Sequence, residues 1–106
     1  MIDAKTVEEI IELYKKHGWT LRRALLSPEA KDLASSIPEP VQQYPSDIDA
    51  LWFSRQSKRD NVTWELRRLS ELPFALVAVV STTASEEEIE STLDQVLDEM
   101  RERTIA

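Results

Sequence analysis

Residues 62–69 read Val62-Thr-Trp-Glu-Leu-Arg-Arg-Leu69, and residues 74–81 read Phe74-Ala-Leu-Val-Ala-Val-Val-Ser81. The first stretch alternates apolar and polar side chains, which predicts a half-buried antiparallel strand. The second stretch is apolar from its start to Val80, which predicts a strand with apolar groups on both faces. Because only residues 70–73 separate the two stretches, we expect them to be neighbours in one sheet.

Two more strands are expected upstream, at Trp19–Ser27 and Asp49–Arg55. Short connections predict that the last three strands form a meander. We expect the strand at 19–27 to pair beside the strand at 74–81. That order would place the 74–81 strand inside a four-stranded, mainly antiparallel sheet.

Helices are predicted at both ends of the chain, over Thr6–His17 and residues 86–103. Thr6 and Glu9 have the spacing of a capping box, and Ser85 and Glu88 repeat it before the second helix. The only glycine, residue 18, would end the first helix in a left-handed conformation. Both helices have one apolar stripe, which indicates that each packs one face against the sheet.

The segment between the first two strands starts with Pro28, which predicts a short helix over 28–36 with Ser27 as its cap. Prolines at 38, 40 and 45 then predict an irregular surface connection. The whole chain, 1–106, is expected to be one α+β domain of order α-β-(short α)-β-β-β-α. We expect a two-layer sandwich with the N- and C-terminal helices on one face of the sheet.

Composition restricts the classes of function. The chain has no cysteine and one histidine, so no disulfide or thiolate metal site is possible and no cofactor or metal is expected. The formal charge of −7 disfavours nucleic acid and anionic membranes as partners. The N-terminus lacks the pattern of a signal peptide, and the longest apolar run is too short to span a bilayer. A cytoplasmic protein without a membrane partner is expected.

No catalytic motif stands out in the sequence. His17 has the position of a favourable cation at a helix C-terminus. Glu86, Glu90 and Asp94 share one helix face, but no loop of spaced oxygen ligands accompanies them, so a solvated acidic surface is expected. The sequence favours a non-enzymatic role.

The second strand supplies the main functional expectation, because Trp52 and Phe53 point to opposite faces. Two helices on one face would leave the other apolar face uncovered, and such faces usually bind proteins. We therefore expect a protein–protein interaction or self-association module, possessing a protein partner or forming a homodimer. The arginines would form a polar, steering rim. The predicted contact residues are Trp52, Phe53, Arg55, Arg67, Phe74 and Leu76.

Three alternatives stay open at this point. The proline-rich segment would remove the uncovered face if Val41 and Tyr44 folded back over it. A cleft with carboxylates, Tyr14 or Tyr44 would instead suit an enzyme or a small-molecule site. Aromatic side chains beside arginines would suit single-stranded nucleic acid, against which the acidic charge argues.

Overall fold

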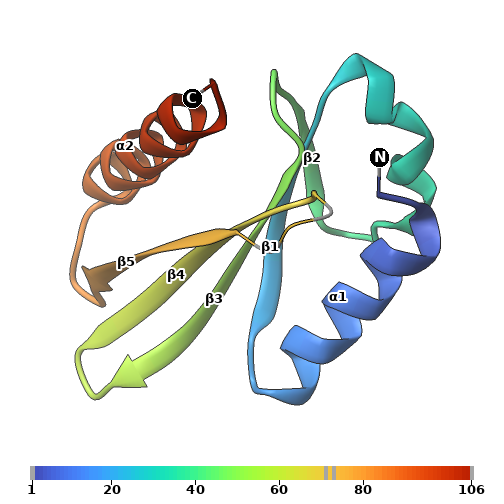
Figure 1. The fold of residues 1–106 in the computed structure, drawn as a ribbon. Coiled ribbons are helices and arrows are strands. Elements are labelled where there is room, and N and C mark those ends of the chain that lie inside the picture. The colour runs from blue at the N-terminus through green and yellow to red at the C-terminus, as the bar shows by residue number, and fades with distance from the viewer. Residues whose placement is uncertain (1, 71, 73, 106) are drawn as a thin grey trace.

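The computed structural model describes residues 2–70, 72 and 74–105, and Figure 1 shows their arrangement. The α+β class is confirmed. Glu71 and Pro73, in the predicted short connection, lie outside the described residues. The elements are α1 (Ala4–Lys16), β1 (Thr20–Leu26), the 3₁₀ helix η1 (Pro28–Ser36), β2 (Gln42–Pro45), β3 (Ala50–Lys58), β4 (Asn61–Arg68), β5 (Ala75–Ser81) and α2 (Glu86–Ile105).

The strands of the described residues form one five-stranded sheet in the order β2-β1-β3-β4-β5. The predicted pairing of the first strand with the last is wrong, because β1 pairs antiparallel with β3. The meander of β3, β4 and β5 is confirmed. β5 therefore lies at an edge of the sheet and not inside it.

The four-stranded prediction missed β2, which pairs parallel with β1. It lies within the proline-rich connection that we expected to be irregular. A strand at the sheet edge uses only one side of its backbone, so it tolerates a proline such as Pro45. η1 supplies the crossover that a parallel pair requires.

The two terminal helices lie on opposite faces of the sheet, so the prediction of one shared face is wrong (Figure 1). α1 and η1 pack against side chains that include Leu51 and Phe53. α2 packs against the other face, which includes Trp52 and Trp64. The sheet is the middle of three layers because β3 directs large apolar groups to both sides.

The start of α1 differs from the predicted capping box. Asp3 is the N-cap, and its Oδ1 accepts a hydrogen bond from the backbone N–H of Thr6 at 2.8 Å. The helix thus begins one turn before the position that the predicted cap would give, because Asp3 satisfies a free N–H group of the first turn that starts at Ala4. Gly18 follows the helix with a φ of 87°, as its left-handed role predicts.

The predicted Ser85 cap of α2 is confirmed. The Glu88 N–H donates to Ser85 Oγ at 3.2 Å, and that hydroxyl donates to the Glu88 carboxylate at 3.3 Å.

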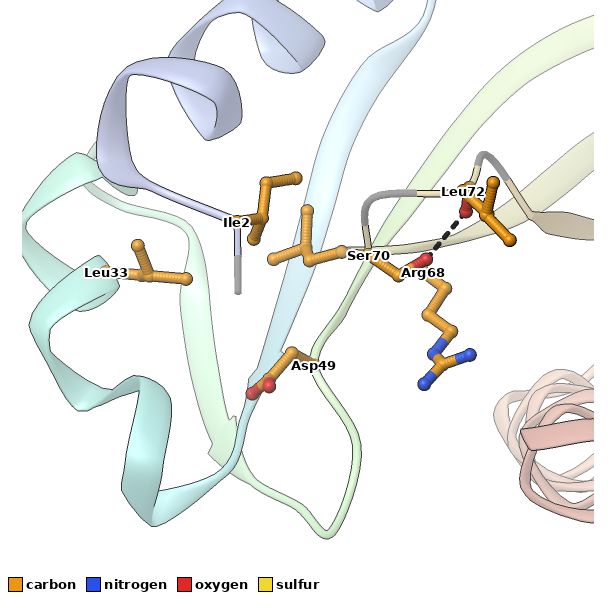
Figure 2. Close-up of a pocket in the computed structure, with 7 residues that line it drawn as sticks. Ile2, Leu33, Asp49, Arg68, Ser70 and Leu72 are labelled. Carbon is orange, nitrogen blue, oxygen red and sulfur yellow. Dashed lines mark hydrogen bonds between the residues drawn. The ribbon is translucent and has the colours of Figure 1, made fainter. Parts of the chain in front are cut away.

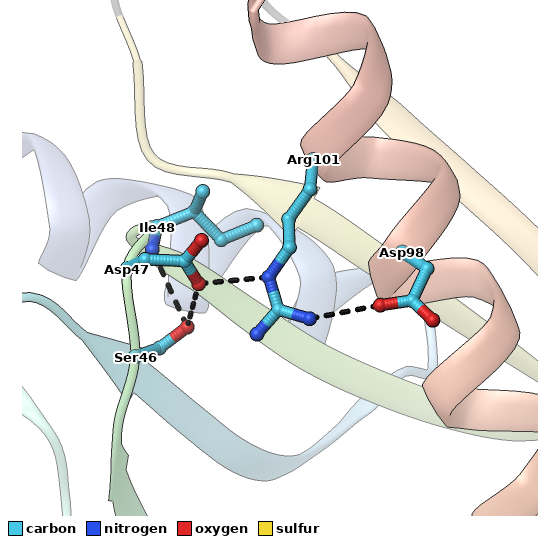
Figure 3. Close-up of polar contacts among 5 residues, drawn as sticks. All are labelled: Ser46, Asp47, Ile48, Asp98 and Arg101. Atoms are coloured by element: carbon cyan, nitrogen blue, oxygen red, sulfur yellow. Dashed lines mark hydrogen bonds and ion pairs between the residues drawn. The ribbon is translucent and has the colours of Figure 1, made fainter.

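Arg101 joins the far end of α2 to the loop before β3 (Figure 3). Its Nε donates to Asp47 at 2.8 Å and its Nη1 to Asp98 at 2.9 Å. The hydrogen bond from Arg101 lowers the pKa of the Asp47 carboxyl.

Asp49 joins the start of β3 to the turn between β1 and η1. Its Oδ1 accepts from the Ser27 N–H at 2.6 Å and its Oδ2 from the Ser27 hydroxyl at 3.2 Å. Ser27 is buried. It is the N-cap residue of η1, as predicted, but its hydroxyl donates to Asp49 and makes no capping hydrogen bond to the helix. The Asp49 carboxylate thus takes the place of water as the acceptor for the Ser27 N–H and the Ser27 hydroxyl.

We predict that Asp49→Ala lowers the free energy of unfolding by about 1–3 kcal/mol, because a buried N–H loses its acceptor. Urea denaturation with an unchanged slope measures this loss. Asp49→Asn is the matched control, because its amide oxygen still accepts from the Ser27 N–H, and it should lose less. Equal urea midpoints for Asp49→Ala and the wild type would contradict the assignment.

Candidate functional site

The side chains of β5 divide cleanly between the two faces of the sheet. Leu76, Ala78 and Val80 belong to the core under α2. Val77 and Val79 point to the opposite face, where each is 60% exposed. The exposed apolar groups of β5 are therefore on the side of the sheet that α1 covers elsewhere.

The cover by α1 stops before it reaches β5. Tyr14 of α1 stacks on Phe53 of β3, with ring centroids 4.0 Å apart, and its hydroxyl donates to Glu65 of β4. Val77 of β5 is paired with Glu65 in the sheet, and beyond Val77 lies the edge of the sheet. The exposed residues here are Ala75, Val77 and Val79 of β5, bordered by the half-buried Thr63, Glu65 and Arg67 of β4; we call these six residues the valine face.

Within the described residues, no strand pairs with the outer edge of β5, and the β5 residues of the valine face are the ones that present this edge. The Arg68 N–H donates to the Phe74 carbonyl and the Thr82 N–H donates to the Asp60 carbonyl, each at 2.9 Å. The even-numbered residues of this strand therefore direct their backbone groups to β4, since the register has no shift between these two pairs. The odd-numbered residues, 75 to 81, direct their N–H and C=O groups outward.

The Tyr14 hydroxyl has an unusual electrostatic environment at the border of the valine face. Burial raises its pKa above the ordinary value of 10.0, and the hydrogen bond to the Glu65 carboxylate raises it further. The folded protein therefore retains this proton to a higher pH than the unfolded chain does.

This shift predicts a loss of stability at high pH. The contribution of Tyr14 is complete below pH 10.0, where the unfolded chain also keeps the proton, and is lost as the pH rises through the raised pKa. Tyr14→Phe cannot ionise, so the stability difference between wild type and variant should shrink as the pH rises above about 10. Urea denaturation of both proteins at neutral and alkaline pH measures it. A difference that is independent of pH would contradict the shift.

The structure separates the six predicted contact residues. Trp52 and Phe53 are 2% and 1% exposed, in the cores under α2 and α1 respectively, so neither offers a partner any surface. Phe74 and Leu76 are half-buried against the α2-side core. The rings that the nucleic-acid alternative needed, including Trp64, are also buried.

Arg55 and Arg67 lie on the same side of the sheet as the valine face. Arg55 is exposed, and it places its guanidinium 4.8 Å from the centre of the Trp19 ring while donating to the His17 carbonyl at 3.0 Å. Arg67 is half-buried, and its guanidinium donates to the carbonyl of Arg68. Both arginines therefore lie on the same side of the sheet as Val77 and Val79, with the Arg55 guanidinium directed toward Trp19 and His17, and their role as a rim stays a prediction.

Val77 and Val79 are not among the contact residues that the sequence predicts. The sequence showed apolar groups on both faces of this strand, but both parities carry similar side chains, so it did not show which of them α2 would bury. The alternative cover, Val41 and Tyr44, also differs from expectation. Val41 packs against the α1-side core, and Tyr44 is exposed at the other edge of the sheet.

A cavity of about 420 Å³ lies at the base of the sheet (Figure 2). Two of its polar side chains are bonded within the chain, because Asp49 accepts from Ser27 and the Ser70 hydroxyl donates to the Leu72 carbonyl at 2.7 Å. In Figure 2 the Asp49 carboxylate and the Arg68 guanidinium point away from each other. The arrangement provides no acid–base pair among these described residues.

Comparison of the chain with protein-family models, curated proteins and solved structures found no match. Among residues 2–70, 72 and 74–105, no cluster of three acidic or histidine side chains is arranged to hold a metal ion. No helix in the described part of the chain has the length and apolar character to cross a membrane. The valine face and the open edge of β5 are the features of the described residues on which a function is proposed below.

Proposed function

We propose that this protein is an interaction module that binds another polypeptide strand along β5. The observation that carries the proposal is the exposure of Val77 and Val79 on a strand whose backbone edge is open. An added strand would take the outward N–H and C=O groups as hydrogen-bond partners and cover the two valines. The free energy of such binding comes from main-chain hydrogen bonds together with the burial of apolar surface.

The two edges of the sheet support this choice. β2 is only four residues long and ends at Pro45, features that protect an edge from unwanted pairing. β5 is seven residues long, has no charged residue and no proline, and pairs with β4 without a bulge. Monomeric proteins usually block an edge strand of this kind with charges, prolines or bulges. The absence of these features from β5 therefore favours an edge that pairs with another strand.

The border of the valine face suits an interface rim. Arg67 and Glu65 of β4 lie next to β5 in the sheet, and Arg55 lies one strand further away. Charged groups around an apolar centre speed association and restrict the choice of partner more than they add affinity. The rim role of Arg55 and Arg67 is therefore retained in the proposal, while Val77 and Val79 form its centre.

A photo-crosslinking amino acid in place of Val79 tests this proposal in cells that produce the protein. We expect it to crosslink to a protein of defined mass, either another copy or a different chain, because the side chain would lie inside the interface. Adding Val77→Lys to the same chain should abolish the crosslink, since a charge in the apolar centre opposes binding.

The matched control places the same amino acid at Gln95, which is exposed on α2. The proposal requires that this position gives no crosslink of the same mass. Identical patterns from positions 79 and 95, or a crosslink that survives Val77→Lys, would overturn it.

A further inference from the structure

We infer that the strand which pairs with β5 is β5 of a second copy, antiparallel and centred on Ala78, so that Val77 lies opposite Val79 of the second copy. This inference rests on the proposed function and names its partner. The two chains would be related by a twofold axis through the middle of the joint sheet. Each copy would supply the same residues to both sides of the contact.

The backbone directions limit the possible registers. Only odd-numbered residues of β5 direct N–H and C=O groups outward, as the bonds at Phe74 and Thr82 show. In an antiparallel pair, residues that exchange hydrogen bonds lie directly opposite each other. Odd-numbered residues of one copy must therefore face odd-numbered residues of the other, which excludes every register shifted by one residue.

Among the allowed registers, the one centred on Ala78 uses the whole strand. Ala78 is the midpoint of Ala75–Ser81, so each residue of the strand gains a partner. The valine face then has Val77 opposite Val79 of the second copy, and the twofold axis repeats the pair. Four exposed valines would meet in the middle of the joined sheet, where β-branched cross-strand pairs are favourable.

The opposite face of the strand is also self-complementary in this register. Leu76 lies opposite Val80 of the second copy, and the two Ala78 residues face each other at the axis. Leu76 and Ala78 are half-buried at the border of the α2-side core. Pairing would therefore join the two α2-side cores as well as the two valine faces, which a charged or polar partner strand would not do.

The paired strands themselves carry none of the formal charge of −7. The acidic α2 helices of the two copies would lie on the same face of the joined sheet and repel each other, so we expect association to strengthen as salt is added. β5 has no charged residue, and the adjacent positions of β4 carry one acidic and one basic side chain, Glu65 and Arg67. The Glu65 side chains of the two copies would be separated by three strand spacings, about 14 Å. That separation exceeds the screening length of about 8 Å at physiological ionic strength.

Analytical ultracentrifugation of the purified chain tests the inference. We expect a reversible monomer–dimer equilibrium, and we expect Val77→Lys/Val79→Lys to be monomeric at the concentrations where the wild type is dimeric. Ser91→Lys/Gln95→Lys is the matched control, because it adds the same charge at exposed positions on α2 and should leave the dimer intact. Circular dichroism and thermal unfolding of each variant at a concentration where it is monomeric show that it is folded.

Cysteine crosslinking tests the register, because the chain has no cysteine of its own. In the register centred on Ala78, Val77→Cys of one copy lies opposite Val79→Cys of the other, within the Cα separation that a disulfide accepts. Oxidation of a mixture of the two variants, one with a mass tag, should give the mixed disulfide in several-fold higher yield than either variant alone.

The outcomes separate this inference from the proposed function. A wild type that stays monomeric, or a dimer that the two lysines do not affect, would overturn the inference. So would a dimer whose Val77→Cys variant crosslinks best to itself. If the chain is monomeric while the probe at position 79 still captures a different protein, only the inference fails. If the probe captures nothing, the proposed function fails too.

Discussion

The structure depends on one constraint, which is that β3 directs large apolar side chains to both of its faces. Leu51 and Phe53 point to one side, and Ala50 and Trp52 point to the other. All four are almost completely removed from water. A strand of this kind is stable only at the centre of a sheet with a covering layer on each side. β1 and β4 flank it, and α1 and α2 must lie on opposite faces.

The division of the helices explains why one part of the sheet stays uncovered. α1 and η1 share the face that includes Phe53, and they lie toward the β1 side of it. Tyr14 extends this cover only as far as Glu65 on β4. α2 follows β5 directly in the sequence and packs back over the other face, where it contacts β5. One helix for each face is enough for β3, but it leaves Val77 and Val79 in contact with water.

The two edges of the sheet differ in chemistry, and so they differ in how well they can pair with an added strand. At one edge, the short β2 carries Pro45, and Tyr44 lies under the guanidinium of Arg23. At the other edge, β5 has neither charge nor proline. Any protein that binds by adding a strand would therefore find only one suitable edge among the described residues. The acidic surface of α2 lies on the far side of the sheet from the valine face, so it does not shield the valines.

The sequence by itself determined the elements that depend on local interactions. The spacing of apolar residues, the Ser85 capping box and Gly18 located both helices and the strands β1, β3, β4 and β5 to within a few residues. It also identified the large apolar groups on both faces of β3. These features follow from residues that are close in the chain and so require no knowledge of the fold.

Only the tertiary structure decided the strand order, the face that each helix covers and the identity of the exposed valines. Each of these depends on contacts between distant segments: β1 pairs with β3, and β2 joins the sheet only because β1 offers a free edge. Val77 and Val80 have the same side chain, and the sequence treats them alike. α2 packs on one face of β5 and not on the other, and that choice alone buries Val80 and exposes Val77.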